Sequence, residues 1–267
     1  MPDATRLPVV FIGHGSPTNT LADNQYTQAW RRLTAALPRP KAILVISAHW
    51  YVGETAVTAM MTPKTIHDFY GFPAELFAYQ YPAKGDPRLA AHVQELLAPI
   101  EARLDQSWGL DHGAWSVLAH IYPDADIPVV QLSIDGTQPA DFHYELGRKL
   151  APLRDQGVLL LASGNVVHNL RVIERREDAA AFPWATAFNT VVRERLLEHE
   201  HAALMNPISL GESARLSIPT PEHYLPLLYA IGAQRDDDAV KVLVDGIDLA
   251  SISMLSVVIG ARLSASA

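Results

Sequence analysis

The arrangement of this chain is decided near its N-terminus by residues 8–18, which read PVVFIGHGSPT. The segment from Pro8 to Ile12 is short, apolar and rich in β-branched side chains, and glycines follow it, so we expect a buried strand that ends in a tight turn. That turn carries His14. In open α/β sheets ligands bind at the carboxyl ends of strands, which makes the turn a candidate site. A single histidine there is more often a hydrogen-bonded structural residue, so the interpretation depends on further histidines.

The same arrangement recurs twice along the chain. A continuous apolar run at residues 42–48 ends at His49, and another at residues 158–163 leads into a turn that carries His168. Such runs are typical of strands buried on both faces of a parallel sheet. Further strands are expected at residues 55–61, 127–134, 240–244 and 251–259, and helices at residues 24–37, 86–100, 116–121, 139–153, 182–205 and from the N-cap Thr220 onward.

The alternation of strands and helices predicts an α/β fold. We expect a single domain over residues 1–267, with a central, mostly parallel or mixed β-sheet flanked by helices. Successive strand ends meet at one edge of such a sheet, which would bring His14, His49 and His168 into one neighbourhood. Two more histidines, His112 in a loop and His223 at a helix start, are placed to join them.

Composition excludes several classes of site and partner. The 267 residues include no cysteine, so disulfides, thiolate metal sites and a cysteine nucleophile are ruled out. The formal net charge of -8 argues against a nucleic-acid partner, which would require a basic face. We find neither an apolar run of about 18 residues nor a signal-peptide pattern, and therefore expect a cytoplasmic protein without a membrane segment. The oligomeric state is not readable from the sequence.

Several histidines without cysteines favour particular chemistry. Imidazole nitrogens suit zinc, iron, copper and nickel. Three of them around a metal with open positions would fit catalytic zinc or non-haem iron, and a further histidine nearby would serve as acid or base. The spacing does not choose between the metals. The chain lacks HExxH, GxGxxG and GxSxG motifs, which disfavours a helix-based zinc protease, a dinucleotide-binding site and a serine hydrolase.

A long loop at residues 65–73, TIHDFYGFP, is the expected wall of a pocket. Its aromatic residues Phe69, Tyr70 and Phe72 are candidates for stacking on an aromatic ring. The alternative is that they anchor the loop to the core, and the sequence favours neither interpretation.

Six motifs in this chain resemble those of the class III, LigB-type extradiol aromatic ring-opening dioxygenases, in particular the 4,5-DOPA dioxygenase branch. They occur in the family's order over nearly the whole chain, which makes the resemblance specific. The motifs are GHGSP at 13–17, SAHW at 47–50, IHDFYGFP at 66–73, DHGAW at 111–115, SGNVVHNL at 163–170 and PEHYLPL at 221–227.

This resemblance implies a single α/β domain with a mixed sheet and a non-haem Fe(II) centre. The implied reaction uses O2 to cleave a catechol ring beside its diol, on a DOPA-like or other catecholic substrate. The implied metal ligands are His14, His49 and His223, with His168 as catalytic acid/base and His112 as a second active-site histidine.

The protocatechuate-cleaving relatives have a glutamate as third ligand, so an all-histidine site makes zinc a second expected metal. One alternative function is a zinc-dependent hydrolase or lyase on the same scaffold. Another is a metal-binding protein without catalysis.

Overall fold

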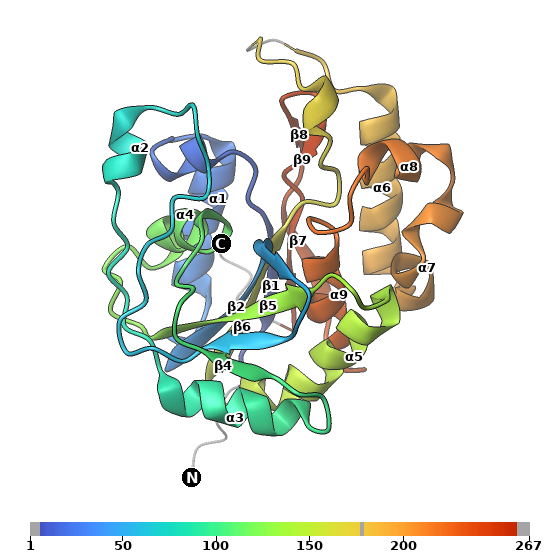
Figure 1. Cartoon of the computed structure of the whole chain (residues 1–267). Coiled ribbons are helices and arrows are strands. Elements are labelled where there is room, and N and C mark those ends of the chain that lie inside the picture. Colours follow the sequence, from blue (N-terminus) through green and yellow to red (C-terminus); the bar gives the residue numbers. More distant parts are fainter. Residues whose placement is uncertain (1–5, 177–178, 261–267) are drawn as a thin grey trace.

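The expected strands assemble into one central sheet in the computed structural model, which describes residues 6–176 and 179–260 (Figure 1). Within these residues the sheet has eight strands in the order β4-β3-β5-β2-β6-β1-β10-β7. A separate pair is formed by β8 and β9. The strands are β1 (Val9–Gly13), β2 (Ala42–Val52), β3 (Ala56–Thr58), β4 (Arg103–Asp105), β5 (Val129–Asp135), β6 (Val158–Gly164), β7 (Val240–Val244), β8 (Ile247–Asp248), β9 (Ile252–Ser253) and β10 (Ser256–Ile259).

The four central strands β5, β2, β6 and β1 are parallel to one another. At one side β10 pairs antiparallel with both β1 and β7, and at the other β3 pairs antiparallel with β5. The sheet is therefore mixed, with a parallel centre. All four central strands end at the same edge, so the residues that follow them are brought together by topology.

Helices cover both faces of the sheet, as Figure 1 shows with α1 and α4 on one side and α5, α6 and α9 on the other. In β1 the side chains alternate between two separate cores: Val10 and Ile12 face α1 and α4, whereas Val9 and Phe11 face α5, α6 and α9. This arrangement confirms the predicted α/β fold with a mixed sheet flanked by helices. The helices are α1 (Gln25–Ala36), α2 (Ala74–Ala78), α3 (Pro87–Leu97), α4 (His112–Ile121), α5 (Ala140–Leu150), α6 (Pro183–Leu197), α7 (His201–Met205), α8 (Glu212–Ser217) and α9 (Leu225–Gly232).

Three expected elements are different in the structure. The helix predicted over residues 182–205 is interrupted between α6 and α7, where His199 adopts a φ of 58°, a left-handed conformation that cannot continue a helix. The strand predicted over residues 251–259 is divided into β9 and β10, because the amide of Met254 donates to the Gly246 carbonyl instead of continuing one ladder.

The helix predicted from Thr220 begins only at Leu225. The Thr220 hydroxyl donates to the Glu222 carboxylate (2.7 Å) and caps no helix. Moreover, the His223 carbonyl accepts from the Asn165 amide (2.8 Å) instead of a helical amide. His223 therefore lies in a turn that is tied to the loop after β6.

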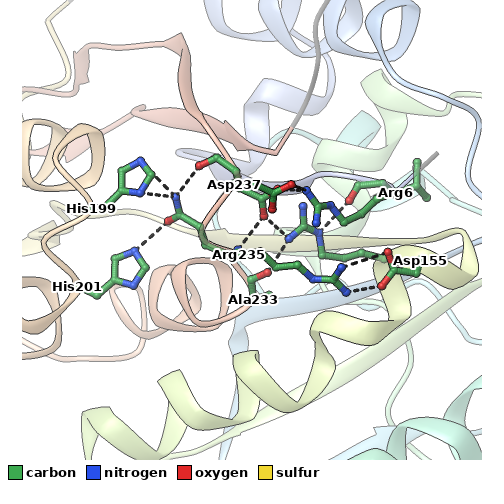
Figure 2. Close-up of polar contacts among 11 residues, drawn as sticks. Arg6, Asp155, His199, His201, Ala233, Arg235 and Asp237 are labelled. Atoms are coloured by element: carbon green, nitrogen blue, oxygen red, sulfur yellow. Dashed lines mark hydrogen bonds and ion pairs between the residues drawn. The ribbon is translucent and has the colours of Figure 1, made fainter.

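The opposite, amino-terminal end of the parallel strands is closed by a polar network around buried Arg154. Figure 2 shows this network, with Arg6, Ala233 and Asp237 among the labelled residues. The Arg154 guanidinium donates to the carbonyls of Leu7 (2.8 Å) and Ala233 (2.7 Å) and pairs with buried Asp238 (2.5 Å). These contacts join the start of β1 to the end of α9. At the edge of the network His201 bonds to Gln234 (2.9 Å), so this histidine is a structural residue.

Another histidine away from the candidate site is expected to make the fold sensitive to acid. His143 of α5 is fully buried, and this burial lowers its pKa to about 4. The unfolded chain has the ordinary pKa near 6.5, so it binds the proton first as the pH falls. Stability from His143 is therefore present above about pH 6.5 and lost as the pH falls toward 4, by about 2 kcal/mol between pH 7 and pH 5.

Urea unfolding at pH 7 and pH 5 checks this expectation. A His143→Gln variant should lose less unfolding free energy over this interval than the wild type does. The matched control is His92 of α3, whose side chain is 37% exposed, and His92→Gln should behave like the wild type in this comparison. Equal pH dependence in His143→Gln and wild type would contradict the assignment.

In the described part of the chain, no helix combines the length and the apolar character that a membrane crossing requires.

Candidate active site

Five histidines meet at the carboxyl edge of the parallel strands. His14 follows β1, His49 lies in β2, His112 is the first residue of α4, His168 follows β6 and His223 precedes α9. The ring centroids of His14 lie 5.1 Å from His49, 5.7 Å from His112 and 5.5 Å from His223. All five residues predicted from the sequence are thus brought together by the fold.

Two glycines allow these elements to approach so closely. A Cβ at Gly164 would lie 2.3 Å from the His223 carbonyl oxygen, and one at Gly113 would lie 2.4 Å from the Ser47 hydroxyl and 2.9 Å from the His49 ring. Any side chain at either position would push a histidine out of place. These glycines are therefore needed for contact between segments, and neither has a positive φ.

Hydrogen bonds orient the first two imidazoles toward each other. The Ser163 hydroxyl donates its only proton to the Gly113 carbonyl (2.6 Å), so it accepts from His14 Nδ1 (3.0 Å). This leaves a lone pair on His14 Nε2. His49 Nδ1 lies 3.1 Å from an Asp68 oxygen, so in the neutral form of this ring the proton is on Nδ1 and the lone pair is on Nε2. The two Nε2 atoms are 3.2 Å apart, the distance of a hydrogen bond between the two rings, and a metal ion bound to both nitrogens would take the place of the shared proton.

Asp68 connects two of the histidines through one carboxylate. Its Oδ2 is the atom near His49, while its Oδ1 lies 3.0 Å from His112 Nδ1 and accepts from the His112 backbone amide (2.9 Å). Burial opposes ionisation of Asp68, but the contacts with His112 and His49 outweigh it and hold the carboxyl pKa well below its usual range. A carboxylate in this position fixes ring orientation and tautomer.

Sequence reasoning placed Asp68 inside the loop motif but assigned it no role. The available signal was an acidic residue in a loop expected to wall the pocket. A second missed residue is Asp111, which is buried, accepts from Ser47 (2.6 Å) and is contacted by Gln131. It also caps α4 through the Ala114 amide (3.2 Å), and so it fixes the start of the helix that carries His112.

On the other side of the site, His168 stacks on His223. The ring centroids are 3.4 Å apart and the planes are inclined by 9°. Glu222 lies 3.2 Å from His223 Nδ1, whereas His223 Nε2 is buried without a hydrogen-bond partner in the described structure. A buried acceptor without a hydrogen-bond partner destabilises a protein. The position of His223 Nε2 is therefore explained if this nitrogen binds a ligand or a metal ion.

The distances between possible metal-ligand atoms divide the site into two groups of residues. Ligand atoms of His14, His49 and His112 all lie within 4.8 Å of one another, and so do those of His168, Glu222 and His223. The predicted ligand set of His14, His49 and His223 takes members from both groups. His49 and His223 face each other with ring centroids 5.0 Å apart, so the three rings still border one space.

Burial determines the charge of most of these rings. Desolvation and the neighbouring imidazoles lower the pKa of His14 and of His223 well below the ordinary value. The same causes lower the pKa of His112 and of His168 to about 4. For His49, burial is outweighed by the contact with Asp68 and by the charge of Asp111, and the pKa is raised. The neutral imidazoles of these two neighbouring groups are donors suited to a borderline metal ion.

The histidines border a cavity of about 410 Å³. The loop at residues 65–73 forms one wall, and the three aromatic residues predicted there, Phe69, Tyr70 and Phe72, all line it. Phe69 is buried and packs on Phe72 (5.3 Å) and His112 (5.6 Å). Tyr70 is 91% exposed and stands at the rim. Phe69 therefore anchors the loop and borders the cavity at the same time.

Comparison with known proteins identifies the family. A family model described as the catalytic LigB subunit of aromatic ring-opening dioxygenase matches residues 8–260. The chain belongs to this family. It is 55% identical over 261 residues to a protein named 4,5-DOPA dioxygenase extradiol from Escherichia coli K12, an alignment that covers 96% of each chain. A protein of the same name from Beta vulgaris is 38% identical over 240 residues, 87% of this chain and 89% of that one.

Structural comparison agrees with this membership. The crystal structure of an uncharacterized protein from Escherichia coli K12 matches this LigB-family chain with a TM-score of 0.84 and 51% identity, covering 96% of this chain and 100% of that one. The protein is an extradiol dioxygenase that opens a catechol ring, and the prediction made from the six motifs is confirmed.

Proposed function

We propose that this enzyme is a non-haem Fe(II) dioxygenase that uses His14, His49 and His223 as metal ligands and acts on a DOPA-like catechol. The observation that carries the proposal is that the rings of His14, His49 and His223 border one buried space, with the Nε2 atoms of His14 and His49 3.2 Å apart. The buried, unpartnered Nε2 of His223 supports the third ligand. The names of the relatives from Escherichia coli and Beta vulgaris support the substrate class.

Bound Fe(II) would supply positive charge that favours ionised catechol oxygens, together with redox chemistry for O2. The side chains provide the rest. His168 lines the cavity, and in the described structure neither of its ring nitrogens has a hydrogen-bond partner, so it can take a proton from a catechol hydroxyl and later return it. His112 lies at Asp68 through Nδ1 and is neutral, so its Nε2 is placed to accept a hydrogen bond from a hydroxyl group in the cavity. Phe69 and Phe72 exclude water from the aromatic ring.

The same donor set also suits zinc, which is the metal of the alternative hydrolase or lyase function. Membership in a dioxygenase family favours iron. The two metals predict different dependence on oxygen: an extradiol dioxygenase consumes one O2 per catechol opened, whereas a hydrolase or lyase turns over without O2.

Metal analysis coupled to an oxygen electrode tests the proposal. Protein loaded anaerobically with Fe(II) is expected to consume oxygen with L-DOPA or a related catechol and to form a yellow ring-opened product, while zinc-loaded protein should not. Absence of oxygen uptake across a broad catechol panel would overturn the proposal. Turnover that continues under anaerobic conditions would favour the zinc enzyme.

A second expectation concerns Asp68. The Asp68→Asn variant keeps the size of the side chain but removes the charge that holds His49 and His112, so metal affinity should fall about 10- to 100-fold. Competition with a chelator of known affinity measures this change. Glu75→Gln, which removes an exposed carboxylate from neighbouring α2, is the matched control and should bind metal like the wild type. Unchanged affinity in Asp68→Asn would rule out the orienting role.

A further inference from the structure

The cavity has a polar floor and a largely apolar outer wall. The floor consists of the histidines, of which His14 and His112 are 1% and 4% exposed. The outer wall includes Leu170 and Ile173, which come from the segment that follows His168. Leu170 is 56% exposed, so this segment forms the rim. A catechol whose diol reaches the floor would direct its remaining substituent along this apolar wall toward solvent.

Arg175 stands at the end of the same segment. It is exposed, and among the described residues that line the cavity it is the one lysine or arginine. Its neighbour Glu174 pairs with Arg176 (3.6 Å), and within residues 6–176 and 179–260 the Arg175 guanidinium has no ion-pair or hydrogen-bond partner. The chain has a net charge of -8, yet this cavity has at its rim a guanidinium that is unpaired among the described residues and can bind an anionic group of a ligand.

The backbone around Arg175 is held in place. The Glu174 amide donates to the Leu249 carbonyl (3.0 Å), and the Asn169 amide donates to the Ser251 carbonyl (3.2 Å). These bonds attach both ends of the rim segment to the chain beside β9, so the arginine extends from a fixed base. Among the described residues, the one carboxylate that lines the cavity is Asp68, and it is occupied by His49 and His112 at the floor. Residues 6–176 and 179–260 therefore offer Arg175 no free anion in this cavity.

We propose that Arg175 determines substrate specificity by binding a carboxylate that the catechol carries on a short hydrocarbon side chain. This inference rests on the proposed function and makes it more specific. The apolar residues Leu170 and Ile173 lie beside the linker, and the guanidinium pairs with the acid group. Among the described residues, no carboxylate free to recognise an amino group lines the cavity, so the test uses a catechol propanoate without one.

Binding and turnover of two matched catechols test this assignment. The compounds are 3-(3,4-dihydroxyphenyl)propanoate and 4-ethylcatechol, which share the ring and the start of the side chain but differ in the carboxylate. Calorimetry on the metal-loaded enzyme without oxygen gives Kd, and oxygen uptake gives KM and kcat. In Arg175→Gln, the Kd and KM for the propanoate should rise about tenfold. This increase is at the low end of what loss of a charged hydrogen bond causes, because the site is exposed to solvent.

The values for 4-ethylcatechol should stay within about twofold, and kcat should change little for either compound. The propanoate preference of the wild type should also weaken as salt is raised, since exposed charges are screened. Arg176→Gln removes the same charge one residue away and is the matched control, with values expected to equal those of the wild type.

Equal losses for both catechols in Arg175→Gln, or the same selective loss in Arg176→Gln, would overturn the assignment. Unchanged Kd for the propanoate would overturn it as well. Because Kd is measured without turnover, absence of oxygen uptake with either compound counts against the proposed reaction, and the binding data still decide the role of Arg175.

Discussion

Replacement of His14 by alanine is expected to abolish both metal binding and oxygen uptake. Its Nε2 lone pair points toward His49 at 3.2 Å, and its ring is held by Ser163 on the other side, so no other side chain can take its position. The loss of metal affinity should exceed the roughly 100-fold upper end that removal of an orienting residue causes. Metal content after dialysis, measured by mass spectrometry, and oxygen consumption with a catechol give the two readouts.

A matched control separates a lost ligand from a damaged fold. His92→Ala removes a partly exposed imidazole from α3, which does not line the cavity, and should keep both metal and activity. The thermal midpoint of metal-free His14→Ala should lie close to that of the metal-free wild type. A His14→Ala protein that retains its metal would show that the ligand set is wrong. His112, whose ligand atom lies within 4.8 Å of those of His14 and His49, would then be tested by the same substitution.

Replacement of His168 by phenylalanine is expected to stop catalysis while the metal stays bound. Phenylalanine keeps a flat ring to stack on His223, where the present centroid distance is 3.4 Å, but it has no nitrogen to exchange a proton. Loss of a general acid/base lowers kcat by about 10²- to 10⁴-fold. Stopped-flow measurement of ring-opening and metal analysis of the same sample test the two parts of the expectation.

The outcomes for His168 distinguish the remaining hypotheses. If His168→Phe loses its metal, His168 is a ligand, as its distance to Glu222 and His223 would allow. If activity is unchanged, the acid/base role is wrong. A protein that binds metal through His14, and in which neither the wild type nor His168→Phe turns over any catechol, would fit a metal-binding function without catalysis.

Most of the fold could be predicted because its strands are strongly patterned. The continuous apolar runs that become β1, β2 and β6 can be buried only at the centre of a sheet covered on both faces. Elements at the periphery were predicted less well. The short strand β4 and the short helices α2 and α8 carry too few periodic residues, and the interruption after α6 depends on the left-handed backbone of His199.

The sequence by itself determined which histidines form the site. Each of His14, His49 and His168 follows or ends an apolar strand, and parallel pairing of those strands brings their ends to one edge whatever the details of packing. The sequence pattern also placed His112 and His223 as candidates to join them. The family motifs added the expected roles of these histidines and the ring-opening reaction, and membership in the LigB family confirms that reaction.

Only the tertiary structure decided how these side chains are held. The contacts of Asp68 with His49 and His112, and the hydrogen bond from Asn165 to the His223 carbonyl, join segments that are far apart in sequence. The position of Arg175 at the rim of the histidine cavity likewise depends on the packing of separate segments. No local pattern encodes such contacts, because they depend on distances between separate elements that exist only after the sheet and its covering helices have packed.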